Sequence, residues 1–252
     1  VAGILSEMKK FVLPNDYPDM SSSLMHIYLI EAGPRLLAGM SEESSAHAEQ
    51  FLREMGVNIL LNKRVVDYRD HKVVLEDGTE IATRTFIWVS GVTGVTIGNL
   101  DASLIGRGGR IKVDSFNRVE GMNNVFAIGD QCIQLADENY PNGHPQLAQV
   151  AIQQGELLAK NLIRMEKGQE MKPFHYRNLG SMATVGRNRA VAEFSKVKMQ
   201  GWFAWVMWLV VHLRSILGVR NKVIVLLNWV WNYFTYDQSM RCLLYTSDAA
   251  DD

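Results

Sequence analysis

Residues 117–163, NRVEGMNNVFAIGDQCIQLADENYPNGHPQLAQVAIQQGELLAKNLI, contain the stretch that decides the fold. The apolar run VFAI predicts a short buried strand over residues 123–128, entered from a GMNN turn. The strand ends at Gly129 and Asp130. A glycine has no Cβ, so a ligand can approach its backbone, and open α/β sheets bind ligands at the carboxyl ends of their strands. We therefore expect a ligand site at Gly129 and Asp130.

The second half of this stretch predicts a helix with Pro145 in its first turn, because proline is preorganised for a helix start. The first N–H groups of such a helix form a weakly positive site, suited to an electron-rich group. Gln149 and Gln153 are four positions apart and so share one helix face. The pattern also fits an ordinary amphipathic helix with two solvated glutamines.

Two motifs in this stretch carry a family resemblance. VFAIGDQC resembles the second flavin-binding motif of two-dinucleotide flavoprotein reductases, and AQVAIQQG resembles the AQ-three-residues-Q pattern of type II NADH dehydrogenases. The resemblance implies that Gly129 and Asp130 bind FAD, with Asp130 on the ribityl chain. It implies that the helix start at Ala148 and Gln149 lies beside the isoalloxazine ring, and that Gln149 and Gln153 border a quinone site.

The resemblance also implies a fold class and an activity. The fold would be α/β, with two nested dinucleotide-binding domains of the flavoprotein disulfide-reductase type and C-terminal amphipathic membrane-anchoring helices. The activity would be electron transfer from NADH through FAD to a membrane quinone, without proton pumping. Because the cofactor carries such chemistry, the protein has to bind and orient it.

The N-terminal stretch predicts the second half of a dinucleotide-binding unit. Residues 1–11 read as the end of a helix, and residues 26–30 read as a strand that ends at Glu31. An acid at this place accepts hydrogen bonds from ribose hydroxyls and disfavours a 2′-phosphate, which favours NADH. IYLIEAGPRLL resembles the same family, whose glycine-rich turn would precede residue 1. We therefore expect a C-terminal fragment of a type II NADH dehydrogenase, truncated at its N-terminus.

The next residues predict one helix and several strands. Ser41 is an expected N-cap for a helix over residues 41–55. Strands are expected at residues 57–61, 65–68, 72–75, 80–83 and 111–114. A further buried strand, at residues 85–89, is expected to lead to Gly91. Gly91 would leave room for the nicotinamide end of NADH or would simply be a turn glycine.

The C-terminal part predicts a hairpin and two helices. Strands at residues 182–185 and 190–192 flank Arg187 and Arg189, which would contact lipid phosphate or solvent. Residues 201–213 and 223–234 predict two tryptophan-rich amphipathic helices, each too short to cross a hydrocarbon core of about 30 Å. With the basic residues that join them, the helices favour a membrane-surface anchor. The alternatives are buried core helices or a homodimer interface.

Charge and composition agree with a membrane surface as partner. Residues 1–156 hold 13 basic and 20 acidic side chains, whereas residues 157–241 hold 13 basic and 4 acidic ones. The basic residues are interleaved with apolar ones, which favours lipid over nucleic acid. The 2 cysteines show no metal-ligand spacing and indicate a reducing compartment. We expect a protein peripheral to the cytoplasmic face of a cell inner membrane, in a bacterium.

These features predict four segments. Residues 1–90 would belong to the NADH-binding domain, residues 91–168 to the FAD-binding domain with the quinone-site helix, and residues 169–241 to a membrane-association domain. Residues 242–252 would be a non-native tail. Two other functions remain open: another FAD- and NAD(P)H-dependent reductase, acting on ferredoxin or disulfides, or an inactive membrane-associating fragment.

Overall fold

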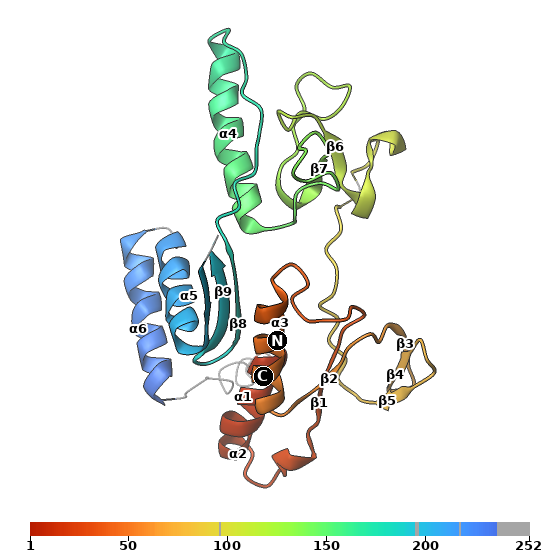
Figure 1. Ribbon diagram of the computed structural model, residues 1–252, viewed down its shortest axis with the longest axis vertical. Helices are drawn as coiled ribbons and strands as arrows, with labels where there is room; N and C mark the ends of the chain where they lie inside the picture. Colours follow the sequence, from red (N-terminus) through yellow and green to blue (C-terminus); the bar gives the residue numbers. More distant parts are fainter. Residues whose placement is uncertain (96, 195–196, 217, 236–252) are drawn as a thin grey trace, which may run out of the picture. The chain divides into compact units, whose positions relative to one another are not determined.

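The computed structural model describes residues 1–95, 97–194, 197–216 and 218–235 (Figure 1). The chain forms two compact units. The first comprises residues 1–86 and 180–252, and the second comprises residues 87–179. The suggested non-native tail, residues 242–252, lies outside the described residues.

The first unit is built around a βαβ element, whose two strands and helix were expected singly and not as one unit. Strand β1 (Ile27–Ile30) leads through helix α3 (Glu42–Glu54) to strand β2 (Val57–Leu60), which pairs with β1 in parallel. Ser41 caps α3, because its hydroxyl accepts a hydrogen bond from the Ser44 amide. Apolar side chains of all three elements form one core, made of Ile27, Leu36, Leu52, Val57 and Ile59.

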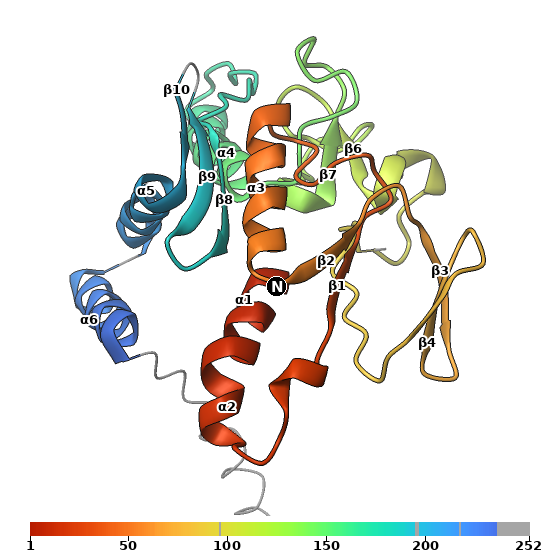
Figure 2. The same cartoon turned by 60° about the horizontal axis from the view of Figure 1, so that its bottom comes forward.

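Helix α3 forms the middle layer of the first unit (Figure 2). One side of it packs on β1 and β2, and on the other side Ala48 packs against Val191 of a second sheet. The N-terminal helical stretch lies in the same unit and consists of α1 (Ala2–Glu7), a π-helical turn (Met8–Val12) and α2 (Leu13–Asp16). It therefore extends beyond the expected end at Phe11.

A three-stranded antiparallel sheet follows β2. Its strands are β3 (Val65–Arg69), β4 (Lys72–Leu75) and β5 (Glu80–Ala82), with the expected turn between the last two. The buried strand expected at residues 85–89 is wrong, since Ile87, Trp88 and Val89 are exposed and form no strand. A strand needs a hydrogen-bonded neighbour, and no strand in the described parts of the chain pairs with these residues.

The C-terminal part of the first unit is a sheet covered by helices (Figure 1). Strands β8 (Ser181–Gly186), β9 (Arg189–Phe194) and β10 (Val197–Gln200) pair in the order β10-β9-β8. The hairpin of β8 and β9 is confirmed, and β10 adds a strand that was not expected. Helix α5 (Gly201–Ser215) packs on this sheet through Ala204, which is fully buried. Helix α6 (Val219–Thr235) packs on α5.

The second unit has a two-stranded parallel sheet and one long helix. Strand β6 (Ile111–Val113) pairs with β7 (Cys132–Gln134), and α4 (Ala148–Glu166) follows. Short 3₁₀ helices occur at Ser22–Leu24 in the first unit, and at Ala102–Leu104, Arg107–Gly109 and Gly129–Gln131 in the second.

Two expectations for the second unit need correction. Residues 123–128 form only an isolated antiparallel bridge, between Phe126 and Arg118, and the strand paired with β6 comes after Gly129 instead. Periodicity alone does not show which of two short runs finds a strand partner. The helix begins at Ala148, with Leu147 as its N-cap, so Pro145 precedes the helix and is not in its first turn.

Candidate functional site

The turn at Gly129 and Asp130 places an exposed carboxylate next to a half-buried glycine. Gly129 adopts a φ of 67°, and a Cβ there would lie 3.2 Å from the Cβ of Ala151 on α4. The turn is therefore close to the helix, and only glycine reaches this conformation without strain. Asp130 is exposed, and the Gln146 side chain donates to its backbone carbonyl at 3.1 Å.

The start of α4 follows this turn. Leu147, the N-cap, is extended and offers no side-chain cap to the helix amides. An uncapped helix start keeps its positive end available to an electron-rich group. The exposed carboxylate of Asp130, the glycine turn and this helix start together fit a polar ligand that carries hydroxyls and an electron-rich ring.

The two glutamines that share a face of α4 bind backbone. The Gln153 amide donates to the Arg177 carbonyl at 2.9 Å and accepts from the Arg177 N–H at 3.1 Å. The Gln149 amide oxygen accepts from the Leu179 N–H at 3.0 Å. The Asn161 amide likewise donates to the Lys172 carbonyl at 2.8 Å and accepts from the Lys172 N–H at 2.9 Å. These amides hold residues 172–179 along the helix, so Gln149 and Gln153 are not simply solvated.

A third glutamine of α4 was missed from the sequence. Gln154 is 1% exposed, and its amide oxygen accepts from the Gly129 N–H at 2.7 Å. Its amide nitrogen donates to the sulfur of Cys132, which is also buried. The signal that could have found it is periodicity, because Gln154 lies four residues after the buried Val150 and seven before the buried Asn161.

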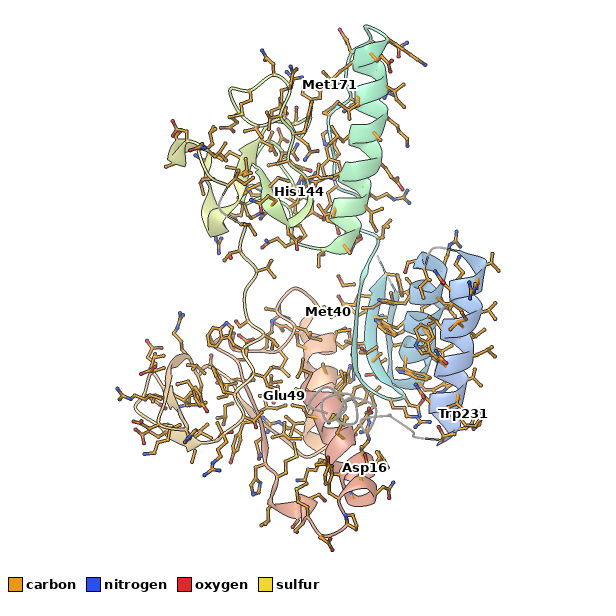
Figure 3. The ribbon with its side chains drawn as sticks, turned by 180° about the vertical axis from the view of Figure 1, so that it is seen from behind. Asp16, Met40, Glu49, His144, Met171 and Trp231 are labelled. Carbon is orange, nitrogen blue, oxygen red and sulfur yellow. The ribbon has the colours of Figure 1, made fainter. Side chains whose placement is uncertain are left out.

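A buried ionisable pair, also missed, lies in the loop before α4. The ring of His144, labelled in Figure 3, is 3.0 Å from the carboxylate of Asp137. The hydrogen bond from His144 holds the pKa of Asp137 below its usual value. Arg110 donates to the carbonyls of Cys132 and His144, at 2.7 and 3.0 Å, and ties the loop to β7.

The two residues expected to bind NADH lie in different units. Glu31 follows β1, and one of its carboxylate oxygens accepts from the Gly33 N–H at 2.8 Å, which shapes the turn after the strand. Gly91 is in the second unit, with a φ of 84°, and a Cβ there would meet no atom within 4 Å. The open space at Gly91 fits a ligand and a simple turn equally well.

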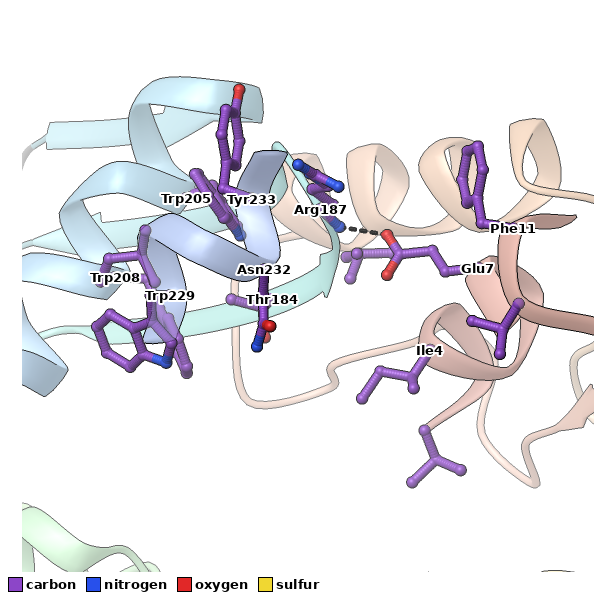
Figure 4. Close-up of a pocket in the computed structure, with 15 residues that line it drawn as sticks. Ile4, Glu7, Phe11, Thr184, Arg187, Trp205, Trp208, Trp229, Asn232 and Tyr233 are labelled. Carbon is purple, nitrogen blue, oxygen red and sulfur yellow. Dashed lines mark hydrogen bonds between the residues drawn. The ribbon is translucent and has the colours of Figure 1, made fainter. Parts of the chain in front are cut away.

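A cavity of about 300 Å³ lies in the first unit (Figure 4). The guanidinium of Arg187 lies 4.3 Å from the centroid of the Tyr233 ring, and the backbone N–H of Arg187 donates to the carboxylate of Glu7. Arg189 is 3.6 Å from Glu54 in an ion pair. The two arginines of the hairpin therefore contact protein groups, which the sequence did not indicate.

Helix α6 presents an unusual amount of apolar surface. Leu227, Trp231 and Phe234 are 62%, 64% and 76% exposed, although the neighbouring Trp229 and Tyr233 pack near tryptophans of α5. A groove of about 350 Å³ with an almost wholly apolar lining runs between the two helices. None of the helices described is both long and apolar enough to cross a membrane.

Comparison with known proteins identifies the class. The profile of the pyridine nucleotide-disulphide oxidoreductase family matches residues 1–155, and the chain belongs to this family. Residues 178–236 match a second profile, that of the NDH2 C-terminal domain. The expected resemblance to type II NADH dehydrogenases is thereby confirmed.

Individual relatives agree with these matches. The chain is 34% identical to the type II NADH:quinone oxidoreductase NdhA of Mycobacterium tuberculosis, over 91% of this chain and 50% of the relative. It is 32% identical to the mitochondrial internal alternative NAD(P)H-ubiquinone oxidoreductase A1 of Arabidopsis thaliana, over 83% of this chain and 44% of the relative. The chain thus spans about half the length of the curated relatives it matches.

A solved structure shows the same fold. NDH2 from Plasmodium falciparum, in complex with NADH, superposes with a TM-score of 0.80 at 18% identity. The match covers 93% of this chain and 63% of that one. At this identity the likeness concerns the fold alone, and it agrees with the expected α/β class.

Proposed function

We propose that the full-length protein is an NADH:quinone oxidoreductase that uses FAD and does not pump protons. The observation that carries the proposal is the presence, in one chain, of the reductase family match over residues 1–155 and the NDH2 C-terminal domain over residues 178–236. That second match favours a quinone acceptor over ferredoxin or disulfides. FAD would supply two-electron redox chemistry, accepting electrons from NADH and donating them to quinone.

The residues of this chain would bind and orient the cofactors. Asp130, exposed at its turn, would accept hydrogen bonds from the ribityl hydroxyls. Gly129, Ala148 and Gln149 would border the flavin, and the uncapped start of α4 would favour electron density on the ring nearby. Glu31 would accept from the ribose hydroxyls of NADH with the carboxylate oxygen that Gly33 does not use, and Gly91 would leave room for the nicotinamide.

The quinone would reach the same helix. Gln149 and Gln153 would border the quinone head group. Their amides bond to the backbone of residues 177–179, so this segment would lie at the same place. The apolar side chains of α6 would dock on a lipid surface on the cytoplasmic side of a cell membrane. Nothing in this arrangement requires a residue of the chain to act as a nucleophile.

A purified full-length protein tests the proposal. We expect a flavin absorbance spectrum, NADH-dependent bleaching of that spectrum, and NADH oxidation that depends on an added short-chain quinone. A protein that binds flavin and NADH yet reduces a disulfide or ferredoxin in preference to quinone would replace this proposal with one of the other reductases. The 252-residue chain, measured alone, shows whether it is instead an inactive membrane-associating fragment.

A further inference from the structure

Two buried side chains, those of Gln154 and Cys132, close a ring of hydrogen bonds with the backbone of Gly129. The Gly129 N–H donates to the Gln154 amide oxygen at 2.7 Å, and the Gln154 amide nitrogen donates to the Cys132 sulfur at 3.5 Å. The Cys132 thiol, in turn, donates to the Gly129 carbonyl at 3.5 Å. The N–H of Gly129 is therefore held by a side chain of α4, and its carbonyl by the thiol of Cys132 on β7 together with the backbone N–H of Cys132.

The chemistry of the two side chains suits this ring. Burial raises the pKa of the Cys132 thiol, so the sulfur keeps the proton that it donates. Gln154 is 1% exposed, and an amide is the neutral group that can accept from one partner and donate to another. Losing either partner would leave a buried polar group unpaired, which costs more than the bond itself contributes.

The short turn that starts at Gly129 is closed on one side only, where the Cys132 N–H donates to the Gly129 carbonyl. Gly129 has a φ of 67°, and glycine pays the largest entropy cost of any residue when it is fixed in one conformation. Nothing on the side chain of glycine can hold it there. The clamp by Gln154 and Cys132 supplies that restraint and faces inward, while Asp130 next to it is exposed.

We infer that Gln154 and Cys132 are positioning residues that fix the Gly129 turn, and with it Asp130, for FAD. The inference rests on the proposed function, since it takes FAD as the ligand of the turn. Neither residue would touch the cofactor. Their effect is to restrain the turn before the cofactor binds, so that less ordering is required on binding.

Asn161 of the same helix provides a matched control. It is also 1% exposed, lies on the same face of α4 and makes two hydrogen bonds to backbone, but these go to Lys172 and not to the turn. Gln154→Leu and Asn161→Leu each remove one buried amide and leave partner groups unpaired. The two variants should therefore lose stability alike and differ in what they do to the turn.

The primary measurement is the Kd for FAD of the full-length apoprotein, with the thermal unfolding midpoint beside it. We expect Gln154→Leu to raise the Kd at least tenfold, while Asn161→Leu lowers the unfolding midpoint and changes the Kd less than twofold. Cys132→Ser keeps a donor to the Gly129 carbonyl, so it should weaken FAD binding less than Cys132→Ala does. Equal Kd changes in Gln154→Leu and Asn161→Leu would overturn the inference.

A second measurement needs no variant to fold. FAD should hold the turn closed over the thiol, so saturating FAD should slow alkylation of Cys132 in the unmutated protein at least tenfold, as followed by mass spectrometry of its peptide. An alkylation rate that FAD does not change would count against the inference. A full-length protein that binds no FAD at all would remove the proposed function first, and the inference with it.

Discussion

At the scale of single residues, two aspartates of the second unit have opposite surroundings. Asp130 is exposed at its turn, whereas Asp137 is 4% exposed and hydrogen-bonded to His144. An exposed carboxylate is available to a ligand, and a buried paired one serves the fold. The same residue type therefore leads to two different predictions.

Asp130→Ala, which removes the acceptor altogether, should weaken FAD binding by the full-length protein. A charge-assisted bond to the ribityl hydroxyls contributes about 1.5–3 kcal/mol, which corresponds to a Kd raised roughly tenfold to a hundredfold. Titration of the apoprotein with FAD measures this Kd. Glu138→Gln, at an exposed acid of the same unit, is the control for loss of charge. An unchanged Kd in the Asp130 variant would refute its assignment.

Asp137→Asn should destabilise the protein and alter its response to acid. The hydrogen bond from His144 lowers the pKa of Asp137, so its stabilisation is complete above the unfolded pKa of about 3.9 and is lost as the pH falls through the lower folded value. At pH 7 the variant should unfold at a lower temperature, and its free energy of unfolding should fall by about 1–3 kcal/mol.

The pH profile of the unfolding midpoint provides the decisive comparison. Below pH 4 the gap between the Asp137→Asn variant and the unmutated protein should narrow, because acid removes the same interaction from the latter. A gap that stays constant from pH 7 to pH 2 would show that the carboxylate charge contributes nothing.

Glu31→Gln should shift nucleotide preference while keeping the turn intact. The glutamine amide oxygen can still accept from the Gly33 N–H, so only the negative charge is lost. That charge repels a 2′-phosphate, and the ratio of kcat/KM for NADH to that for NADPH should fall. If the unmutated enzyme already uses both nucleotides equally well, Glu31 does not select between them.

At the scale of elements, two helix glycines have opposite reasons for being glycine. A Cβ on Gly3 of α1 would lie 1.6 Å from the carbonyl oxygen of Val185, so the helix backbone packs directly on β8. A Cβ on Gly155 of α4 would meet only the Ile128 side chain, at an ordinary 3.7 Å. At Gly3 the close approach of the two backbones excludes any side chain. At Gly155 there is room for one, so helix propensity would favour alanine there.

Gly3→Ala should therefore destabilise the first unit, although alanine is the better helix former. Gly155→Ala should be neutral or stabilise by up to about 1 kcal/mol, because the new methyl group fits. Chemical denaturation of the two variants measures their free energies of unfolding. A Gly3→Ala variant that is as stable as the unmutated protein would show that α1 does not pack on β8 as closely as the structure indicates.

At the scale of the whole molecule, the exposed apolar face of α6 is the surface for which we expect a binding partner. Helix α5 is part of the core, since its fully buried Ala204 packs with Ala190 and Ala192 of β9. Deleting both helices would therefore uncover the sheet, and its result would be ambiguous. Helix α6 can be tested by itself, at its exposed positions.

Replacing Leu227, Trp231 and Phe234 by serine should release the full-length protein from vesicles that contain anionic lipid. Each side chain contributes about 1.5–3 kcal/mol when fully buried, so three changes should lower the partition coefficient at least a hundredfold. NADH oxidation with a soluble acceptor should survive. Asn228→Ser, on the polar side of α6, is the control. Unchanged vesicle binding with loss of a dimer would make α6 a homodimer interface.

Local sequence patterns are enough to predict the elements in which those patterns are strong. The two strands and the helix of the β1–α3–β2 unit, the hairpins and the two C-terminal helices follow from periodicity, caps and turn residues, all of which act over a few positions. The glycine and aspartate of the flavin-type motif also follow from such patterns, as does the family. Each of these signals concerns groups that are neighbours along the chain.

Which groups meet across the chain depends on the three-dimensional packing, and local patterns do not predict it. Residues 132–134 pair with β6, whereas residues 125–128 form only a bridge from Phe126 to Arg118. Gln154 accepts a hydrogen bond from the Gly129 N–H, and Gln149 and Gln153 bond to the backbone of residues 177–179. In this way α4 contacts two segments that are distant from each other in the sequence. A hydrogen bond depends on distance and direction between atoms, and sequence spacing fixes these only within one element.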